Sequence, residues 1–203
     1  CHPFVKYWLH NGFITVNEEK MSKSLGNFFM VIDILEHYEP ETLRFFILST
    51  HYRSPLDFSD ERLAEAQRSL SRLKTAQENL QALMALMNAG PTEESLKLRR
   101  KVLELRNEFM EAMRDDFNTA LAISHMFALA KEINIYHQSI VSVGSKPDGK
   151  LVSILQSVFS EMCSIIGVLE STQGAVEAES CGLEEPLMEM LIAMRQEARS
   201  NKD

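Results

Sequence analysis

The chain has 203 residues, of which 45% are hydrophobic and 25% are charged, so it can bury an apolar core and does not belong to the disordered class. Its formal net charge of −8 argues against nucleic-acid binding through bulk electrostatics, because proteins that bind in that way carry a basic face. Its three cysteines form no CxxC pair, and its apolar runs are shorter than the roughly 20 residues of a membrane span, so the composition indicates a protein of the reducing cytoplasm without a membrane segment.

The N-terminal part has the composition of mixed structure. Asn11 and Gly12 give a turn signal, and residues 13–16 have strand composition. A polar loop is expected over residues 17–27. The hydrophobic period then changes from two to about 3.6 residues, which predicts a helix. The apolar face of this helix is expected to carry Val31, Ile34, Leu35 and Tyr38.

A second short helix is expected from Pro40, because proline fits the first turn of a helix and Glu41 complements the helix dipole. This helix is expected to be buried nearly all round through an apolar run that consists of Leu43, Phe45, Phe46, Ile47 and Leu48. A third helix is expected to begin after Ser59, which can act as its N-cap while Phe58 packs onto Leu63.

This third helix is the first of four long amphipathic helices that are predicted from residue 59 onward. The first ends at the stop signal of Gly90 and Pro91, and the second is capped by Thr92. The third is capped by Asp116 or Asn118. Phe117 is expected to pack beneath this turn, and a fourth apolar stripe covers residues 151–169. Short loops between consecutive amphipathic helices predict an antiparallel bundle, so the fold class is mainly α, with a helical bundle after a short mixed α/β segment.

One string of residues carries chemistry, on the loop between the predicted strand and the first helix. It consists of Lys20, Met21, Ser22, Lys23 and Ser24. Two ammonium groups three residues apart can close over a triphosphate and balance the charge that builds on its β- and γ-phosphates when the α-phosphate is attacked. The serines and nearby backbone N–H groups can donate further hydrogen bonds. A merely solvated loop is the weaker interpretation, because this string has a chance of about one in ten thousand of occurring in a chain of this length.

The string matches the KMSKS signature of the class I aminoacyl-tRNA synthetases, and its surroundings resemble the cysteinyl members of that class. Four segments carry the resemblance: residues 7–12 (YWLHNG), 26–29 (GNFF), 43–58 (LRFFILSTHYRSPLDF) and 115–120 (DDFNTA). The likeness extends over nearly the whole chain and is strongest over residues 5–59.

The resemblance implies a two-step reaction, in which cysteine and ATP give cysteinyl adenylate and pyrophosphate, and the cysteinyl group then passes to tRNA(Cys). Lys23 corresponds to the ATP-contacting lysine of the family, and Lys20 would assist with the departing pyrophosphate. Met21, Ser22 and Ser24 would shape the ATP-binding loop. ATP would act with Mg²⁺. The HIGH-type motif and the zinc ligands of the family are absent from the sequence, so no metal site is expected in this chain and the isolated chain is expected to be inactive.

The resemblance also divides the chain. Residues 1–27 would be the end of a Rossmann-type catalytic domain with the KMSKS loop, residues 28–58 would be connecting helices that contact the tRNA stem, and residues 59–172 would be a helical bundle of the DALR type. Residues 173–182 would be a linker, and residues 183–203 the start of an anticodon-recognition module. We expect the chain to be cut at both ends and the intact protein to be a cytoplasmic monomer.

Other side chains have both a functional and a structural interpretation. Arg53, Arg195 and Arg199 are candidates for tRNA binding, although Arg53 would equally fix the hinge between the two parts of the chain. Trp8 and His10 either line an adenosine pocket or pack in a core.

The densest basic cluster consists of Lys97, Arg99, Arg100 and Lys101. Together with Arg68 and Arg72 it could contact the tRNA backbone, but we favour a solvated face with neighbouring glutamates as intrahelical partners. Cys1 and His2 are adjacent and lack a second pair, so they do not indicate a metal site.

Two alternative functions are also compatible with the sequence. A cysteine ligase that acts on a glucosamine-inositol sugar shares the fold and the lysine signature, but Phe28, Phe29 and the extended C-terminal helices favour the tRNA enzyme. A non-catalytic tRNA-binding or scaffold module would have no need of the intact lysine pair.

Overall fold

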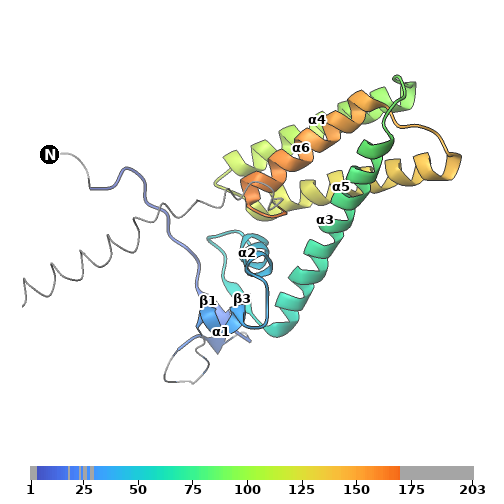
Figure 1. The fold of residues 1–203 in the computed structure, drawn as a ribbon. Helices are drawn as coiled ribbons and strands as arrows, with labels where there is room; N and C mark the ends of the chain where they lie inside the picture. The colour runs from blue at the N-terminus through green and yellow to red at the C-terminus, as the bar shows by residue number, and fades with distance from the viewer. Residues whose placement is uncertain (1–3, 18, 23, 25–26, 28–29, 170–203) are drawn as a thin grey trace, which may run out of the picture. The chain divides into compact units, whose positions relative to one another are not determined.

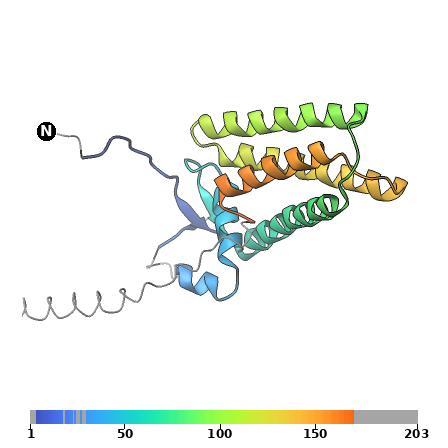
Figure 2. The same cartoon turned by 45° about the horizontal axis from the view of Figure 1, so that its top comes forward.

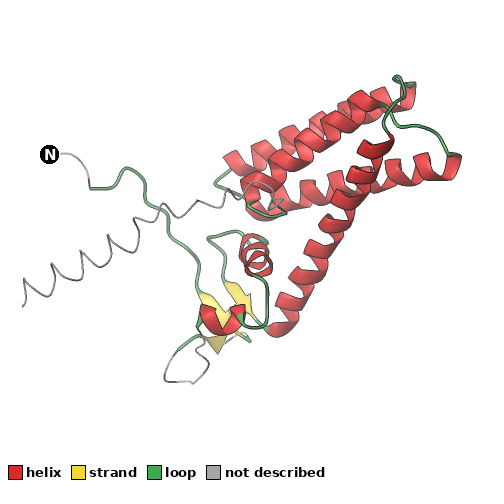
Figure 3. Ribbon diagram, viewed as in Figure 1, coloured by secondary structure: helices red, strands yellow, loops and turns green. Residues whose placement is uncertain are grey.

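The computed structural model describes residues 4–17, 19–22, 24, 27 and 30–169. The elements follow in the order β1 (Ile14–Val16), β2 (Glu19–Lys20), α1 (Val31–Leu35), α2 (Pro40–Leu48), β3 (Leu56–Phe58), α3 (Asp60–Leu86), α4 (Glu93–Arg114), α5 (Thr119–Val143) and α6 (Gly149–Ile166) (Figure 1). The chain is mainly helical with a small sheet near its start, which confirms the predicted fold class (Figure 3).

Polar side chains fix the starts of the four long helices. The Ser59 side chain accepts from the Arg62 N–H at the start of α3, and the Thr92 side chain accepts from the N–H of Ser95 at the start of α4. Asn118 caps α5 in the same way. These three caps are confirmed, and each satisfies a backbone donor that has no partner within its helix.

The four long helices pack into the predicted bundle around one apolar core. Helix α5 packs against α3, α4 and α6, and the four helices lie alongside one another in Figure 2. The largest fully buried side chains include Phe109 of α4, Met126 of α5 and Phe159 of α6. Burial of such a side chain contributes about 1.5–3 kcal/mol, so this core is the main source of stability in the described part of the chain.

Helix α6 is apolar because it belongs to the core. Its 18 residues and mean hydropathy of 1.2 would also suit a membrane-spanning helix by length and composition. Its buried side chains, however, pack within the bundle: Leu151, Val152, Leu155, Val158, Phe159, Met162, Cys163 and Ile166. Core packing therefore accounts for its composition.

The small sheet has the strand order β2-β1-β3. Strand β1 pairs antiparallel with β2, where Thr15 lies opposite Lys20, and parallel with β3, where Ile14 lies opposite Leu56. The sequence predicted β1 but assigned β2 to a loop and missed β3. The chain reverses between β1 and β2 at Asn17, which has a φ of 51°, a left-handed conformation that asparagine tolerates better than most residues.

Two expectations for the short helices are wrong. Helix α1 ends at Leu35, before Tyr38, and Glu39 is already extended because the proline at position 40 disfavours helical backbone in the residue before it. Helix α2 is buried on one side only, since Phe45 and Phe46 face the core while Ile47 is 49% exposed. The physical reason is that α2 packs against α3 through the side that carries Phe45 and Phe46, which leaves Ile47 on the side that faces solvent.

Candidate functional site

The lysine-containing loop begins on β2. Lys20 is the last residue of that strand and is exposed, while Met21 and Ser22 are half-buried and Ser24 is exposed. The Ser22 and Ser24 hydroxyls lie 3.1 Å apart and form a hydrogen bond. Lys23 lies outside the described residues.

The side chain of Asn27 closes this loop. The Ser22 backbone N–H donates to Asn27 Oδ1 at 2.8 Å, and Asn27 Nδ2 donates to the Lys20 carbonyl oxygen at 3.1 Å. Both bonds reach from Asn27 back to the first residues of the loop. The sequence pointed to Asn27 only as part of a family-like segment and gave no sign of these contacts.

The hairpin that presents the loop is anchored to the start of α3. Thr15 Oγ1 of β1 donates to Asp57 Oδ1 of β3 at 2.8 Å, across the parallel strand pair. Arg62 Nε in the first turn of α3 lies 3.8 Å from Asp57 Oδ2. The Asp57 carboxylate thus connects β1 of the sheet to the first turn of α3.

A second polar cluster joins the α2–β3 connection to the turn between α4 and α5. Tyr52 Oη donates to Asp116 Oδ1 at 2.6 Å, and Arg53 Nε lies 2.7 Å from Asp116 Oδ2. The hydrogen bond from Tyr52 and, after it, the Arg53 guanidinium hold the pKa of Asp116 below its ordinary value. The hydrogen bond to Tyr52 and, after it, the Asp116 carboxylate raise the pKa of Arg53. This geometry supports the hinge-fixing role that was one of two interpretations of Arg53.

The turn that carries Asp116 has an unusual backbone. Asp116 and Phe117 have φ values of 54° and 53°, which non-glycine residues seldom adopt. Phe117 is 55% exposed, so the expectation that it packs beneath the turn is wrong. The left-handed backbone directs this ring away from the core while Asn118 caps α5.

The segment ahead of the hairpin is exposed. The rings of Trp8 and His10 are stacked with their centroids 6.4 Å apart, and Trp8 is 72% exposed. The core interpretation of this pair is therefore wrong for the described chain, and the adenosine-pocket interpretation stays a prediction.

The basic cluster on α4 is only partly a solvated face. Lys97 pairs with Glu93 at 2.8 Å within the helix, as favoured, but Lys101 pairs with Glu132 of α5 at 2.7 Å. The Arg99 side chain is only 16% exposed and contacts Asp148 at 2.5 Å. The solvated interpretation is wrong for Arg99, because it lies on the side of α4 that faces the start of α6.

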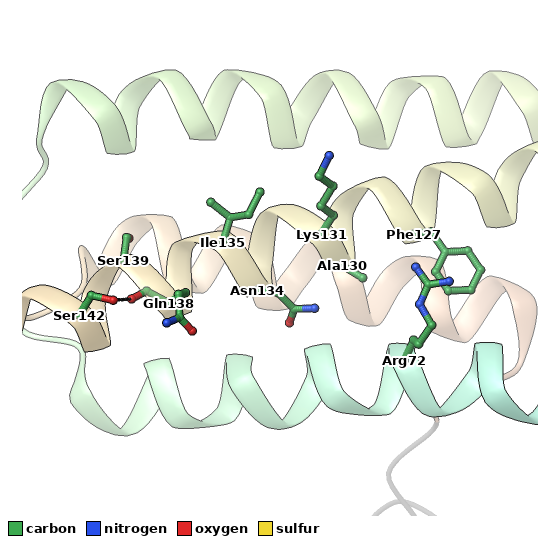
Figure 4. Close-up of a pocket in the computed structure, with 9 residues that line it drawn as sticks. All are labelled: Arg72, Phe127, Ala130, Lys131, Asn134, Ile135, Gln138, Ser139 and Ser142. Carbon is green, nitrogen blue, oxygen red and sulfur yellow. Dashed lines mark hydrogen bonds between the residues drawn. The ribbon is translucent and has the colours of Figure 1, made fainter.

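A surface groove of about 540 Å³ runs along α5 (Figure 4). The Arg72 guanidinium of α3 lies 5.0 Å from the centroid of the Phe127 ring of α5, a cation–π geometry. Lys131 and Asn134 of α5 also line the groove. Arg72, one of the arginines considered for tRNA contact, therefore has a structural partner in the bundle.

Metal-binding groups are not gathered in the part of the chain that the structure describes. None of its His, Cys, Asp and Glu side chains form a group of three or more that could hold an ion. Cys163 is a buried thiol of the core, and burial, with a smaller effect from the nearby Glu41 charge, raises its pKa to about 12. Cys1, His2, Arg195 and Arg199 lie outside the described residues.

Comparison with known families assigns both parts of the chain. Residues 1–68 match the family described as tRNA synthetases class I (C) catalytic domain, and residues 108–170 match the DALR domain. A solved ternary complex of the LeuRS of Agrobacterium radiobacter K84 with tRNA and LeuAMS has the same fold over 79% of this chain and 22% of that chain, with a TM-score of 0.57 at 18% identity. The chain therefore belongs to the class I aminoacyl-tRNA synthetases.

Curated relatives narrow the assignment. The chain is 44% identical to a cysteine–tRNA ligase of Desulforamulus reducens and 46% identical to one of Pelotomaculum thermopropionicum, with 99% of the chain and 43% of each relative covered. A cysteine–tRNA ligase of Bacillus licheniformis is 42% identical over 99% of the chain and 40% of its own length. Within the class, the chain belongs to the cysteine–tRNA ligase family, and it spans about two fifths of the length of these relatives.

Proposed function

We propose that this chain is the part of a cysteine–tRNA ligase that supplies the loop for the ATP phosphates and a helical domain that faces the tRNA. The observation that carries the proposal is the KMSKS string at residues 20–24, placed at the end of a hairpin in a segment that matches the class I (C) catalytic domain. The complete ligase would activate L-cysteine with ATP and transfer the cysteinyl group to tRNA(Cys).

The role of the loop is electrostatic. The cysteine carboxylate attacks the α-phosphate, the bond from the α-phosphorus to the bridging oxygen breaks, and the electron pair leaves with pyrophosphate. Lys20 and Lys23 neutralise the charge that accumulates on the β- and γ-phosphoryl oxygens, which lowers the barrier only if they are in place before the bond breaks. Met21, Ser22 and Ser24 complete the ATP-binding loop. Exposed Lys20 is free of ion pairs among the described residues, so its charge is available to a ligand.

Cofactors, partners and location follow from the same family. ATP would act with Mg²⁺, and Zn²⁺ would be held by ligands that this sequence does not contain. The partners would be tRNA(Cys), ATP and L-cysteine, and the protein would act as a cytoplasmic monomer. Arg195 and Arg199 are proposed tRNA contacts. For Arg53 we propose a contact with tRNA only through the side of its guanidinium that Asp116 leaves open, since the side chain is 64% exposed in its ion pair.

The domain division proposed from the sequence is retained for residues 1–27, 28–58 and 59–172, followed by a linker at 173–182 and an anticodon-recognition module from 183. Residues 59–172 contain all four bundle helices, α3 to α6. The family match to the DALR domain covers residues 108–170 of this bundle.

The test is substitution of each lysine in the complete ligase. Lys20→Ala and Lys23→Ala should each lower the rate of cysteine-dependent ATP–pyrophosphate exchange by about 10²- to 10³-fold, the effect of removing one preorganised transition-state contact, while affinity for tRNA(Cys) changes little. Lys97→Ala, an exposed lysine on α4 that pairs with Glu93, is the matched control and should leave exchange unchanged. Exchange at the wild-type rate in the Lys20/Lys23 double variant would refute the proposal.

Adding each acceptor substrate to the wild-type and variant enzymes separates the alternatives. A ligase that acts on a glucosamine-inositol sugar would form product with that sugar and would not respond to tRNA(Cys). A scaffold module would bind tRNA equally well in wild type and in both lysine variants and would show no exchange.

A further inference from the structure

We infer that Asn27 is a positioning residue, which holds the backbone of Lys20 and Ser22 in the geometry that presents Lys20 to ATP. The inference rests on the proposed function of that loop and extends it to a residue outside the KMSKS string. It starts from one feature of the structure, an amide side chain that bonds to two backbone groups of the loop.

The two bonds have complementary polarity. Asn27 Oδ1 accepts from the Ser22 N–H at 2.8 Å, and Asn27 Nδ2 donates to the Lys20 carbonyl oxygen at 3.1 Å. If the amide were reversed, donor would face donor and acceptor would face acceptor, so the pair of contacts fixes its orientation. A primary amide at this position satisfies both backbone groups, whereas an alkyl side chain of similar size could make neither bond.

The bonds also close a loop. They connect Asn27 to residues seven and five positions earlier in the chain, and the segment between them contains Lys23. At the start of the loop, Lys20 belongs to β2, which pairs with β1. The amide therefore ties Asn27 to a strand that is itself held in the sheet, so part of the cost in chain entropy of presenting Lys20 is met before ATP binds.

The inference assigns a role to the half-buried position of Asn27. Its polar atoms bond to the backbone of Lys20 and Ser22, so these bonds leave the Lys20 ammonium group for the phosphates. Asn27 acts through Lys20 and Ser22, so it is not a catalytic residue. Its loss should raise the fraction of molecules in which the loop is open, without removing any charge that acts on ATP.

The experiment compares Asn27→Ala with Asn11→Ala in the complete ligase. Asn11 is an exposed asparagine ahead of the hairpin, so it controls for the loss of an amide near the site. The first measurement is the rate of tryptic cleavage after Lys20 and Lys23. We expect it to rise about tenfold in Asn27→Ala, the change in open population that two ordinary hydrogen bonds supply, and to stay within about twofold in Asn11→Ala.

The second measurement is the steady-state kinetics of ATP–pyrophosphate exchange. Asn27→Ala should lower kcat/KM for ATP about tenfold and leave the KM for cysteine unchanged, because the loop contacts only the nucleotide. An unchanged cleavage rate would overturn the inference, and so would faster cleavage with normal ATP kinetics. Absence of exchange in the wild-type ligase would instead refute the proposed function, and the cleavage rates would still decide whether Asn27 holds the loop.

Discussion

Asp148 is the most connected polar side chain of the bundle, and its removal should have the largest effect on stability among the polar positions. It is 3% exposed and accepts from Ser95 Oγ at 2.7 Å and from Arg99 Nη2 at 2.5 Å. Its other oxygen caps α6 by accepting from the N–H groups of Lys150 and Leu151. The Asp148 carboxylate thus accepts hydrogen bonds from two side chains of α4 and from two backbone N–H groups at the start of α6.

The expected magnitude follows from these contacts. Asp148→Ala leaves the Arg99 guanidinium without its partner in a site where the arginine side chain is only 16% exposed, and breaking a buried ion pair in this way costs about 3–5 kcal/mol. Asp148→Asn keeps an oxygen that can cap α6 but loses the charge, so it should cost about 1.5–3 kcal/mol. Against a total stability of about 5–15 kcal/mol, either loss is large.

The assay is urea unfolding of the purified chain, followed by the far-ultraviolet circular dichroism of the bundle. Asp60→Asn, an exposed aspartate in the first turn of α3, is the matched control and should cost less than about 1 kcal/mol. The double variant Asp148→Asn/Arg99→Met should be more stable than the sum of the two single changes predicts, because Met leaves no buried charge. A free energy of unfolding for Asp148→Ala within about 0.5 kcal/mol of wild type would refute the reasoning.

The same carboxylate predicts a dependence on pH. Burial alone would raise the pKa of Asp148, but the hydrogen bonds from Ser95, Arg99 and the α6 backbone together hold it below its ordinary value. A lowered pKa in the folded state gives stability that is present above the unfolded value of about 3.9 and is lost as the pH falls through the folded value. The difference in unfolding free energy between wild type and Asp148→Asn should therefore be constant near neutrality and shrink below about pH 4.

Two further predictions concern other parts of the chain. Because burial raises the pKa of Cys163 to about 12, its thiol should resist iodoacetamide at about pH 8 in the folded chain and react once urea unfolds the bundle, as peptide mass analysis would report. A side-chain carbon on Gly12 would lie 2.5 Å from the carbonyl carbon of Ser54, so Gly12→Ala should speed hydrogen exchange of the Leu56 amide, which donates to Phe13 in the sheet. Gly90→Ala, where nothing lies within 4 Å of the added carbon, should leave that exchange unchanged, and equal rates in both variants would contradict the prediction.

Much of the bundle was predictable because the signals are local. An apolar stripe with a period near 3.6 residues marks a helix wherever it occurs, and Ser59, Thr92 and Asn118 cap through backbone groups within three residues of their own position. The KMSKS string was equally visible, since its chemistry lies in five adjacent residues. Strands β2 and β3 were missed because they contain Glu19, Lys20 and Asp57, residue types that are depleted in strands, whereas the equally short β1 consists of β-branched residues.

The errors fall where distant residues meet. Arg99 is buried because the start of α6 brings Asp148 to it from 49 residues away, and the charge pattern of α4 by itself indicated only a solvated face. Tyr52 meets Asp116 across 64 residues, and Phe117 is exposed because the turn around that aspartate is left-handed. Such pairings depend on how the helices pack against one another. The period of apolar residues along a single helix does not specify that packing.

The sequence by itself determined the family, the mainly helical fold and the string of residues that handles phosphates, because each of these is written in contiguous or periodic residues. Only the tertiary structure decided which charges are buried, which side of α2 faces the core, and that the amide of Asn27 bonds back to Lys20 and Ser22. Charge burial and loop closure are properties of groups that the fold brings together in space, so they become visible only when the packed helices and the paired strands are known.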